Sequence, residues 1–411
     1  MILSPETTSL WAKKQTIDGE TAWLPLIAHL IDTQNVITWL YKNWLTADQR
    51  LFLSINTSKN DTQKLVKFIG FMHDIGKSTA AFTFKKGFDD HLDKRFLRKL
   101  TKSGIPSKST ELLFDFKTPH GLAGEALLLK EYGIPKSIAA IIGGHHGFPI
   151  EYDPSGQIDD FKANYFQDDK NEQTQLVWRK MQTELFQYGL ETSGYNSSRE
   201  IPEVSQPQAI ILEGLLIMAD WLASSEYMDK DKKKVLFPLI PLDKGWQDIS
   251  TDERFETAMA NWSQAFNQWI PQAVSTKEDP YQERWHFKAS QMQKIMTDAI
   301  STFKEPGMTI VEAPTGSGKT EIALIAAEQL AKSGKCNGVY FALPTQATTN
   351  AMYKRVEKWL AFLAKKQNTS FSINLAHSKA KLNQDYLNLP DASGIDSFDG
   401  KDKTGTVTVN S

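Results

Sequence analysis

The sequence predicts a multidomain protein, in which an all-α domain is followed by an unfinished α/β domain with a parallel sheet. At 411 residues, the chain is long enough for about two or three domains. Apolar residues recur at helical spacing through most of residues 1–270. After residue 285, two strand-like runs are each followed by a turn and a helix, which is the alternation that builds a parallel sheet.

The helical part is predicted from five segments with this spacing, and strand-like alternation is scarce there. The polar stretch 151–172 predicts a loop or an insertion, and the prolines within 237–245 break helix again. We therefore expect a helical domain over 1–270, a linker over 271–285 and an incomplete α/β domain over 286–411. The five helical segments are 23–45, 62–76, 122–133, 136–147 and 208–226.

Composition excludes several classes of protein. The net charge of −2 gives no general attraction to nucleic acid, so any such binding must come from local patches. The single cysteine, Cys336, excludes a disulfide framework and fits a reducing compartment. We find no run of about 18 apolar residues and no signal peptide, so we expect a cytoplasmic protein without a membrane segment.

Seven candidate metal ligands, five histidines and two aspartates, fall in apolar helical contexts of the first 270 residues. A buried carboxylate such as Asp220, within the apolar run "LLIMADWLAS", needs a cation or strong donors. Asp74 has two oxygens and is the natural bridge between two ions. Lys77 follows His73 by four residues, which predicts that the two share a helical face. The candidate ligands are His29, His73, Asp74, His120, His145, His146 and Asp220.

The order of these residues is the H…HD…D signature of the HD phosphohydrolase superfamily. With "HDIGK", "GGHHG" and the late "AD", the chain resembles the CRISPR-associated helicase–nuclease of type I systems. The resemblance implies two divalent ions, with Asp74 shared between them, and catalytic roles for Asp74 and Lys77. It implies that the first ion is held by His29, His73, Asp74 and Asp220, and the second by Asp74, His120, His145 and His146.

The donor types indicate which metals fit. Imidazole and carboxylate ligands together suit Mn²⁺, Fe²⁺, Co²⁺ or Ni²⁺ better than Mg²⁺, which prefers shells made only of oxygen. Two such ions about 4 Å apart can clamp a phosphodiester, and Lys77 offers a positive charge to the transition state.

The segment "EAPTGSGKT" follows a strand-like run and opens a predicted helix, and this pattern predicts a phosphate-binding loop. Backbone N–H groups of such a loop cradle phosphates, the lysine reaches the β and γ phosphates, and the following threonine offers its hydroxyl to Mg²⁺. Ala313 replaces the usual first glycine, a form that resembles superfamily 2 helicases. We expect ATP with Mg²⁺ to bind through Thr315, Gly316, Ser317, Gly318, Lys319 and Thr320.

Two further segments resemble helicase motifs. "FALPTQATTN" is similar to a motif that holds single-stranded DNA, through Thr345 and Gln346, and "FKASQMQ" places Gln291 where the family reads adenine. The acidic helicase motif is missing after the loop. The chain thus resembles about the N-terminal half of such a protein, with the first part of a RecA-like domain, and we expect no ATP hydrolysis from it.

The resemblance implies a monomeric nuclease that cuts single-stranded DNA on the non-target strand opened by Cascade, the surveillance complex that carries CRISPR RNA. A basic run over 85–102 could guide that strand, although such runs are usually solvated helix faces. Two other functions stay open. One is a nucleotide phosphohydrolase that uses the same HD site, and the other is a non-catalytic fragment that docks on Cascade.

Overall fold

The computed structural model describes residues 1–373, apart from 18–19, 55–57, 86–89, 107–111, 113–114, 148–152, 229–230, 266–268, 335, 337, 344–345, 369–370 and 372. The chain divides into two compact units. Unit 1 holds Met1–Tyr227 and Lys232–Asn261, and unit 2 holds Met228–Asp231 and Trp262–Ser411. The division near residue 261 lies ahead of the boundary expected at 270–285, and the domain assignment itself stays a prediction.

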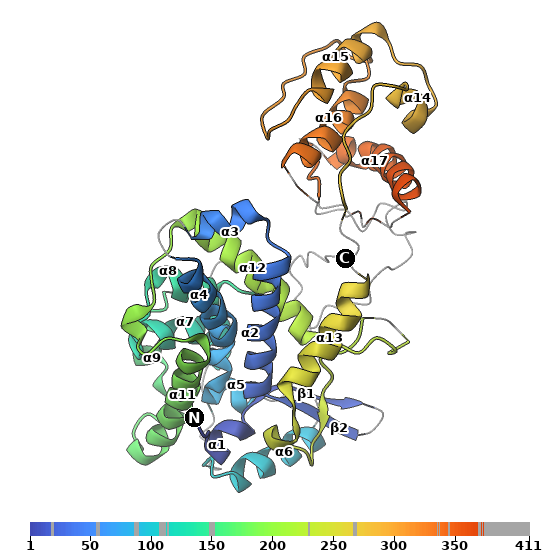
Figure 1. Ribbon diagram of the computed structural model, residues 1–411. Helices are drawn as coiled ribbons and strands as arrows, with labels where there is room; N and C mark the ends of the chain where they lie inside the picture. Colours follow the sequence, from blue (N-terminus) through green and yellow to red (C-terminus); the bar gives the residue numbers. More distant parts are fainter. Residues whose placement is uncertain are drawn as a thin grey trace. The chain divides into compact units, whose positions relative to one another are not determined.

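Three helices form the centre of unit 1. α2 (Leu26–Asn43), α4 (Lys59–Met72) and α12 (Gln206–Ser224) pack against one another in pairs (Figure 1). α2 is buried along most of its length, and four of its polar residues, His29, Asp32, Thr33 and Gln34, are buried as well. A polar group at such a position needs partners inside the protein.

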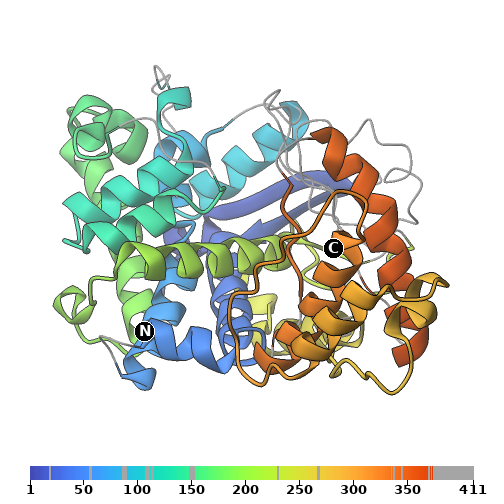
Figure 2. The ribbon, with the colours of Figure 1, turned by 90° about the horizontal axis from the view of Figure 1, so that it is seen from above.

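A second layer covers these helices. α7 (His120–Lys130) and α8 (Lys136–Gly143) pack side by side, and α8 also contacts α12 (Figure 2). The long α11 (Glu172–Ser193) packs against α4. The other helices assigned in this part of the chain are α1 (Pro5–Ser9), α3 (Ala47–Leu53), η1 (Ile75–Ser78), α5 (Ala80–Thr83), α6 (Asp90–Lys102), η2 (Asp115–Lys117), α9 (Gln157–Asp160), α10 (Lys162–Phe166), η3 (Ser198–Glu200), η4 (Trp246–Asp248) and α13 (Thr251–Ala265).

Unit 1 also contains a small antiparallel sheet that the all-α prediction missed. β1 (Trp11–Ile17) pairs with β2 (Glu20–Pro25), and β2 pairs with the short β3 (Ile240–Pro241). The helix expected to start at Trp23 starts at Leu26, because Pro25 stands at its N-cap and the residues before it pair as a strand. The buried rings of Trp11, Trp23 and Phe96 lie between the sheet and α6.

The polar stretch predicted as a loop is partly helical. Its described residues form α9 and α10, and Tyr165 and Phe166 at the end of α10 are fully buried. Burial of these two aromatic side chains stabilises helical structure in a stretch whose polar composition predicted a loop.

Unit 2 is helical in its described residues. These form α14 (Pro280–Trp285), α15 (Gln291–Ser301), α16 (Lys319–Gly334) and α17 (Gln346–Gln367). No strand is assigned in the described part of this unit, so the parallel sheet stays a prediction. The two runs expected as strands are largely solvent-exposed, as at Met308, Ile310 and Tyr340.

α12 is long and apolar enough, by length and composition alone, to cross a membrane. It instead packs inside unit 1 against α2, α4 and α8, and it carries the buried carboxylate Asp220.

Candidate metal centre

The centre is built around the end of α4. That helix stops at Met72, His73 caps it, and the chain turns at Asp74 into the short helix η1. The expectation that His73 and Lys77 share a helical face is therefore wrong, because the α-helix ends between them. The turn instead brings Lys77 Nζ to 2.6 Å from Asp74 Oδ2.

A first group of ligand atoms joins three helices. His29 Nε2 on α2 lies 3.0 Å from Asp74 Oδ2, 3.2 Å from His73 Nε2 and 3.3 Å from Asp220 Oδ1 on α12. His73 Nε2 lies 3.4 Å from the same Asp220 oxygen. All four residues are buried, and one ligand atom of each lies within 4.8 Å of the others.

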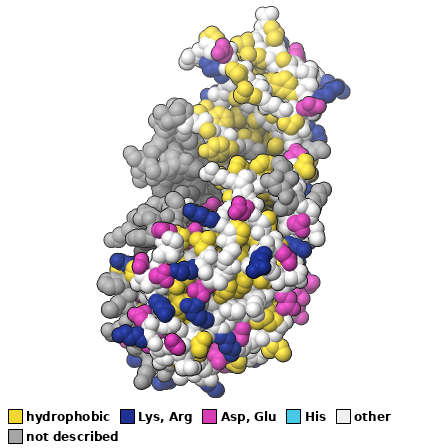
Figure 3. All heavy atoms as spheres, turned by 90° about the vertical axis from the view of Figure 1, so that its left-hand side faces the viewer, with side chains coloured by type: hydrophobic (Ala, Val, Ile, Leu, Met, Phe, Trp, Pro, Cys, Tyr) yellow, Lys and Arg dark blue, Asp and Glu magenta, His cyan; other side chains and the backbone are white. Residues whose placement is uncertain are grey.

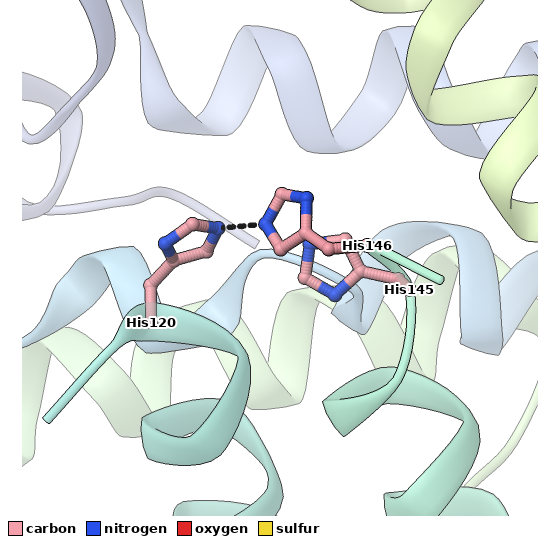
Figure 4. Close-up of side chains that lie close together, drawn as sticks. All are labelled: His120, His145 and His146. Atoms are coloured by element: carbon pink, nitrogen blue, oxygen red, sulfur yellow. Dashed lines mark hydrogen bonds between the residues drawn. The ribbon is translucent and has the colours of Figure 1, made fainter. Parts of the chain in front are cut away.

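A second group lies at the ends of α7 and α8. His120 is the first residue of α7, while His145 and His146 follow the C-cap of α8, where the chain turns after Gly144. Their rings converge in Figure 4, and the Nε2 atoms of His120 and His146 are 2.7 Å apart. The ligand atoms of these three histidines also lie within 4.8 Å of one another.

Asp74 lies between the two groups. Its Oδ2 faces His29 and His73, and its Oδ1 lies 3.4 Å from His120 Nε2 and 3.6 Å from His145 Nε2. The structure thus brings together all seven predicted ligands, and Asp74 has the position expected of a carboxylate shared by two ions.

Backbone carbonyls set the tautomers of two of these rings. His73 Nδ1 lies 2.9 Å from the carbonyl oxygen of Gly70, and His145 Nδ1 lies 2.6 Å from that of Ile142. A carbonyl only accepts, so each Nδ1 carries a hydrogen and each Nε2 is the ring nitrogen that faces the centre. Such outer contacts orient metal-binding histidines.

Charges in the centre shift several pKa values. Burial tends to lower the pKa of His73, but the neighbouring Asp74 and Asp220 raise it to about 9. Burial opposes ionisation of Asp74, yet Lys77 and His73 hold its pKa well below the usual range, and His29 and His73 do the same for Asp220. Burial lowers the pKa of His146 to about 4. At neutral pH the ring of His73 is therefore protonated, and a cation bound there would displace that proton, because an imidazole ligates a metal only when it is neutral. With its proton displaced, the ring and the ionised carboxylates form a donor set for cations.

The donor atoms fit divalent ions. Among the described residues, Asp74 Oδ1 and His145 Nε2 are buried without any hydrogen-bond partner, although both face the other ligand atoms. A buried polar atom without a partner is costly, and a bound cation would remove that cost. The arrangement can therefore hold one ion in each group.

The phosphate loop lies in unit 2, ahead of α16. Gly316 and Gly318 have positive φ angles of 82° and 84°, and Lys319 Nζ donates to the carbonyl oxygens of Ala313 and Pro314. Ser317 Oγ donates to Pro314 O at 2.6 Å. Thr315 precedes Gly316 in the turn, and Thr320 is the second residue of α16.

Three other residues of unit 2, Gln291, Thr345 and Gln346, were predicted to bind adenine or DNA. Gln291 is exposed at the start of α15, whereas the buried Gln293 points at the loop, since a Cβ added to Gly318 would lie 2.3 Å from its Nε2. Thr345 lies outside the described residues, and for Gln346 the structure gives only its place at the start of α17. The roles of Gln291, Thr345 and Gln346 stay predictions.

The described residues on the face shown in Figure 3 do not form a continuous basic path for nucleic acid. On the face of the molecule shown in Figure 3, basic and acidic side chains are intermingled with polar and apolar ones. In the basic run, Lys99 covers the ring of Trp23 and donates to the carbonyl oxygens of Leu242 and Lys244. Its ammonium group is therefore engaged in contacts within the protein. A guiding role for this run stays a prediction.

Fold and site together define a helical HD domain followed by a helicase-type domain. The family model for the Cas3 HD domain matches residues 11–228, and the model for DEAD/DEAH box helicases matches residues 292–391. The first match spans more than half of the chain, so the chain belongs to the Cas3 family. The resemblance drawn from the histidine pattern is thereby confirmed.

Relatives and solved structures agree with this family. The CRISPR-associated nuclease/helicase Cas3 of Streptococcus thermophilus is 38% identical over 97% of this chain and 43% of its own length. The Cas3 endonuclease/helicase of Thermus thermophilus is 25% identical over 95% of this chain and 39% of its own. A crystal structure of T. fusca Cas3-AMPPNP shares the fold, with a TM-score of 0.59 and 22% identity over 92% of this chain and 40% of that one. The chain therefore spans less than half the length of the curated relatives it matches.

Proposed function

We propose that unit 1 is a metal-dependent nuclease that hydrolyses phosphodiester bonds of single-stranded DNA during CRISPR interference. The observation that carries the proposal is the meeting of two groups of ligand atoms at one buried carboxylate, Asp74. A site of that form suits two-ion hydrolysis, in which both the attacking and the leaving oxygen need stabilisation.

The ligand roles divide between the two groups. His29, His73, Asp74 and Asp220 would hold one ion, and Asp74 with His120, His145 and His146 would hold the other. When bound, the ions polarise the phosphate and provide an activated water. Their identity follows from the mixed donors, which favour Mn²⁺, Fe²⁺, Co²⁺ or Ni²⁺ over Mg²⁺.

The chain's own residues supply positioning and charge. Asp74 and Asp220 are ionised in the site, and the carbonyls of Gly70 and Ile142 hold the rings of His73 and His145 in the binding tautomer. Lys77 Nζ lies 2.6 Å from Asp74 Oδ2. In the reaction it offers its ammonium group to a phosphate oxygen as negative charge builds up there.

The partners follow from the family. The relatives are named CRISPR-associated nucleases and helicases. We infer that the protein acts in the cytoplasm, as a monomer, on the strand opened by Cascade and its CRISPR RNA. ATP with Mg²⁺ would bind at the loop of Thr315–Thr320 and drive movement along DNA in the full-length protein.

Metal analysis combined with a cleavage assay tests the proposal. The purified chain should contain about two transition-metal ions and cut a single-stranded oligonucleotide in the presence of Mn²⁺, Co²⁺ or Ni²⁺. Asp74→Ala should abolish both metal binding and cleavage. Asp159→Ala, at an exposed aspartate that pairs with Lys130 on the surface, should alter neither.

Two outcomes would redirect the assignment. Hydrolysis of deoxynucleoside triphosphates without cleavage of the oligonucleotide would identify a nucleotide phosphohydrolase at the same site. Metal-independent binding to Cascade without any hydrolysis would identify a docking fragment. Cleavage unchanged by Asp74→Ala would remove the basis for the whole site.

A further inference from the structure

Lys13 and Lys14 are adjacent on β1 and point to opposite sides of the strand, as alternation requires. Lys14 Nζ lies 2.8 Å from Asp93 Oδ1 on α6, and it sits over the ring of Trp11. Lys13 Nζ reaches the other way and donates to the carbonyl oxygen of Ser224, at 2.5 Å. The two lysines therefore serve two different parts of unit 1.

Ser224 is the last residue of α12, the helix that carries Asp220. The last carbonyls of a helix have no partner within it, and a cation near them is favourable. Lys13 supplies that partner from β1, which is 211 residues away in sequence. It thus ties the end of α12 to the sheet.

The same serine touches the metal centre. Ser224 Oγ donates to Asp220 Oδ1 at 3.1 Å, and this oxygen also faces His29 and His73. A continuous chain of contacts therefore runs from the ammonium group of Lys13 through Ser224 to a candidate metal ligand.

Lys13 also lies within the electrostatic field of the centre. Burial and the positive charge of Lys77 lower the pKa of Lys13 to about 8, against the opposing effects of Asp220, Glu226 and Asp74. Glu226 in turn accepts a hydrogen bond from Gln15, the next residue on the same side of β1. The alternate side chains of β1 thus hold the segment that leaves α12.

We propose that Lys13 is a positioning residue of the metal centre, which holds the C-terminal turn of α12 so that Ser224 keeps Asp220 in place for the first ion. The inference rests on the proposed metal centre, and it assigns Lys13 no contact with the substrate. Outer residues that orient metal ligands typically change metal affinity by about 10- to 100-fold when they are lost.

A purely electrostatic role predicts the opposite sign. If Lys13 acted only as a nearby positive charge, its removal would relieve repulsion and tighten binding of a cation. If it acts by holding α12, its removal loosens Asp220 and weakens binding. The direction of the change in metal affinity therefore separates the two.

Titration calorimetry with Mn²⁺ at fixed pH, on the full chain, provides the measurement. Lys13→Met should weaken the first ion by about tenfold, while the second ion changes less. Lys13→Arg keeps a long cationic donor and should restore most of the affinity. Lys14→Met is the matched control, since it removes the neighbouring lysine from the opposite side, and it should leave both affinities unchanged even if it lowers the unfolding temperature.

The contact chain itself is tested by Ser224→Ala, which removes the hydroxyl and keeps the carbonyl that Lys13 contacts. This variant should also weaken the first ion, and the double variant with Lys13→Met should lose less than the sum of the two effects. Unchanged or tighter Mn²⁺ binding by Lys13→Met would overturn the inference. Absence of Asp74-dependent Mn²⁺ binding in the unsubstituted chain would instead overturn the proposed function.

Discussion

The two functional regions differ in how completely the described residues assemble them. In unit 1 the candidate ligands come from five separate segments of the chain, most of them are buried, and they already face one another. In unit 2 the phosphate loop is exposed or half-buried, and its lysine donates to carbonyl oxygens of the same loop. One region is built by distant contacts, and the other by local backbone conformation.

This difference separates two ways of preparing a site. The metal centre is organised by groups that are costly to leave unpaired, so the fold fixes it before any ligand arrives. The loop has the positive φ angles of a phosphate cradle, but Lys319 must leave its carbonyl partners to reach a phosphate. We expect the metal centre to respond to ligands as a rigid body and the loop to respond by local ordering.

Ligand-dependent amide exchange tests that contrast with the largest expected effect. Saturating Mn²⁺, at about 100 times its dissociation constant, should stabilise unit 1 by about 2.7 kcal/mol for each ion that it binds. Hydrogen exchange in α2, α4, α7 and α8 should slow accordingly, while exchange in α16 stays constant. Mg-ATP should slow exchange only near the loop. Equal protection of both units by Mn²⁺ would contradict the contrast.

Ion pairs provide a second test. The Asp32 side chain on α2 is fully buried, and its Oδ2 accepts from Arg254 Nε at 3.2 Å and Nη2 at 3.1 Å. Arg254→Met strands a buried charge and should destabilise unit 1 by about 3 kcal/mol in urea unfolding. Lys366→Met in unit 2 breaks an exposed pair with Glu283 and should cost less than about 0.5 kcal/mol.

The loss of folding stability caused by Arg254→Met should depend on pH. Burial raises the pKa of Asp32, and Arg254 opposes that rise. A carboxyl whose pKa is higher in the folded state destabilises the fold once the unfolded state ionises, so its cost grows as the pH rises above the ordinary carboxyl value. The stability difference between Arg254→Met and the unsubstituted chain should therefore shrink between pH 7 and pH 4. A constant difference would mean that Asp32 does not carry the effect.

The residue pattern predicted which side chains meet at the candidate metal centre. It did not predict how the backbone turns to bring them together. His29, His73 and Asp220 converge because each lies on the buried face of a helix, and helical periodicity reveals such faces. The turn at Asp74 was not predictable from periodicity, because apolar residues continue through Ile75 into η1. Directly after the turn, η1 packs against α7.

The sheet and its lysines were missed for a related reason. In "WAKKQTI" the two adjacent lysines hide the alternation, since both are polar although they face different environments. Ser224, whose carbonyl oxygen accepts a hydrogen bond from Lys13, lies 211 residues away in the sequence. Information of that kind is held in long-range contacts, which a single sequence does not display.

Close packing gives a third comparison between the regions. A Cβ on Gly76 in η1 would lie 1.9 Å from the carbonyl oxygen of His120 and 2.6 Å from the amide nitrogen of Gly124, both of which are backbone atoms. Gly76→Ala must push α7 away, so we expect a loss of about 1–3 kcal/mol in urea unfolding. Because α7 begins at His120, the second ion should also bind more weakly in calorimetry. Unchanged binding would show that α7 can shift without moving its first residue.

The glycine of the exposed loop should give a smaller effect than Gly76. A Cβ on Gly316 would meet nothing within 4 Å, but its φ of 82° is unfavourable for a residue with a side chain. Gly316→Ala should therefore cost about 1 kcal/mol through the backbone alone, seen in the unfolding of unit 2. Mn²⁺ affinity in unit 1 should stay unchanged, whereas Gly76→Ala lowers it. If Gly316→Ala cost as much as Gly76→Ala, the loop would be held by contacts as close as those of the metal centre, and the distinction between the two regions would fail.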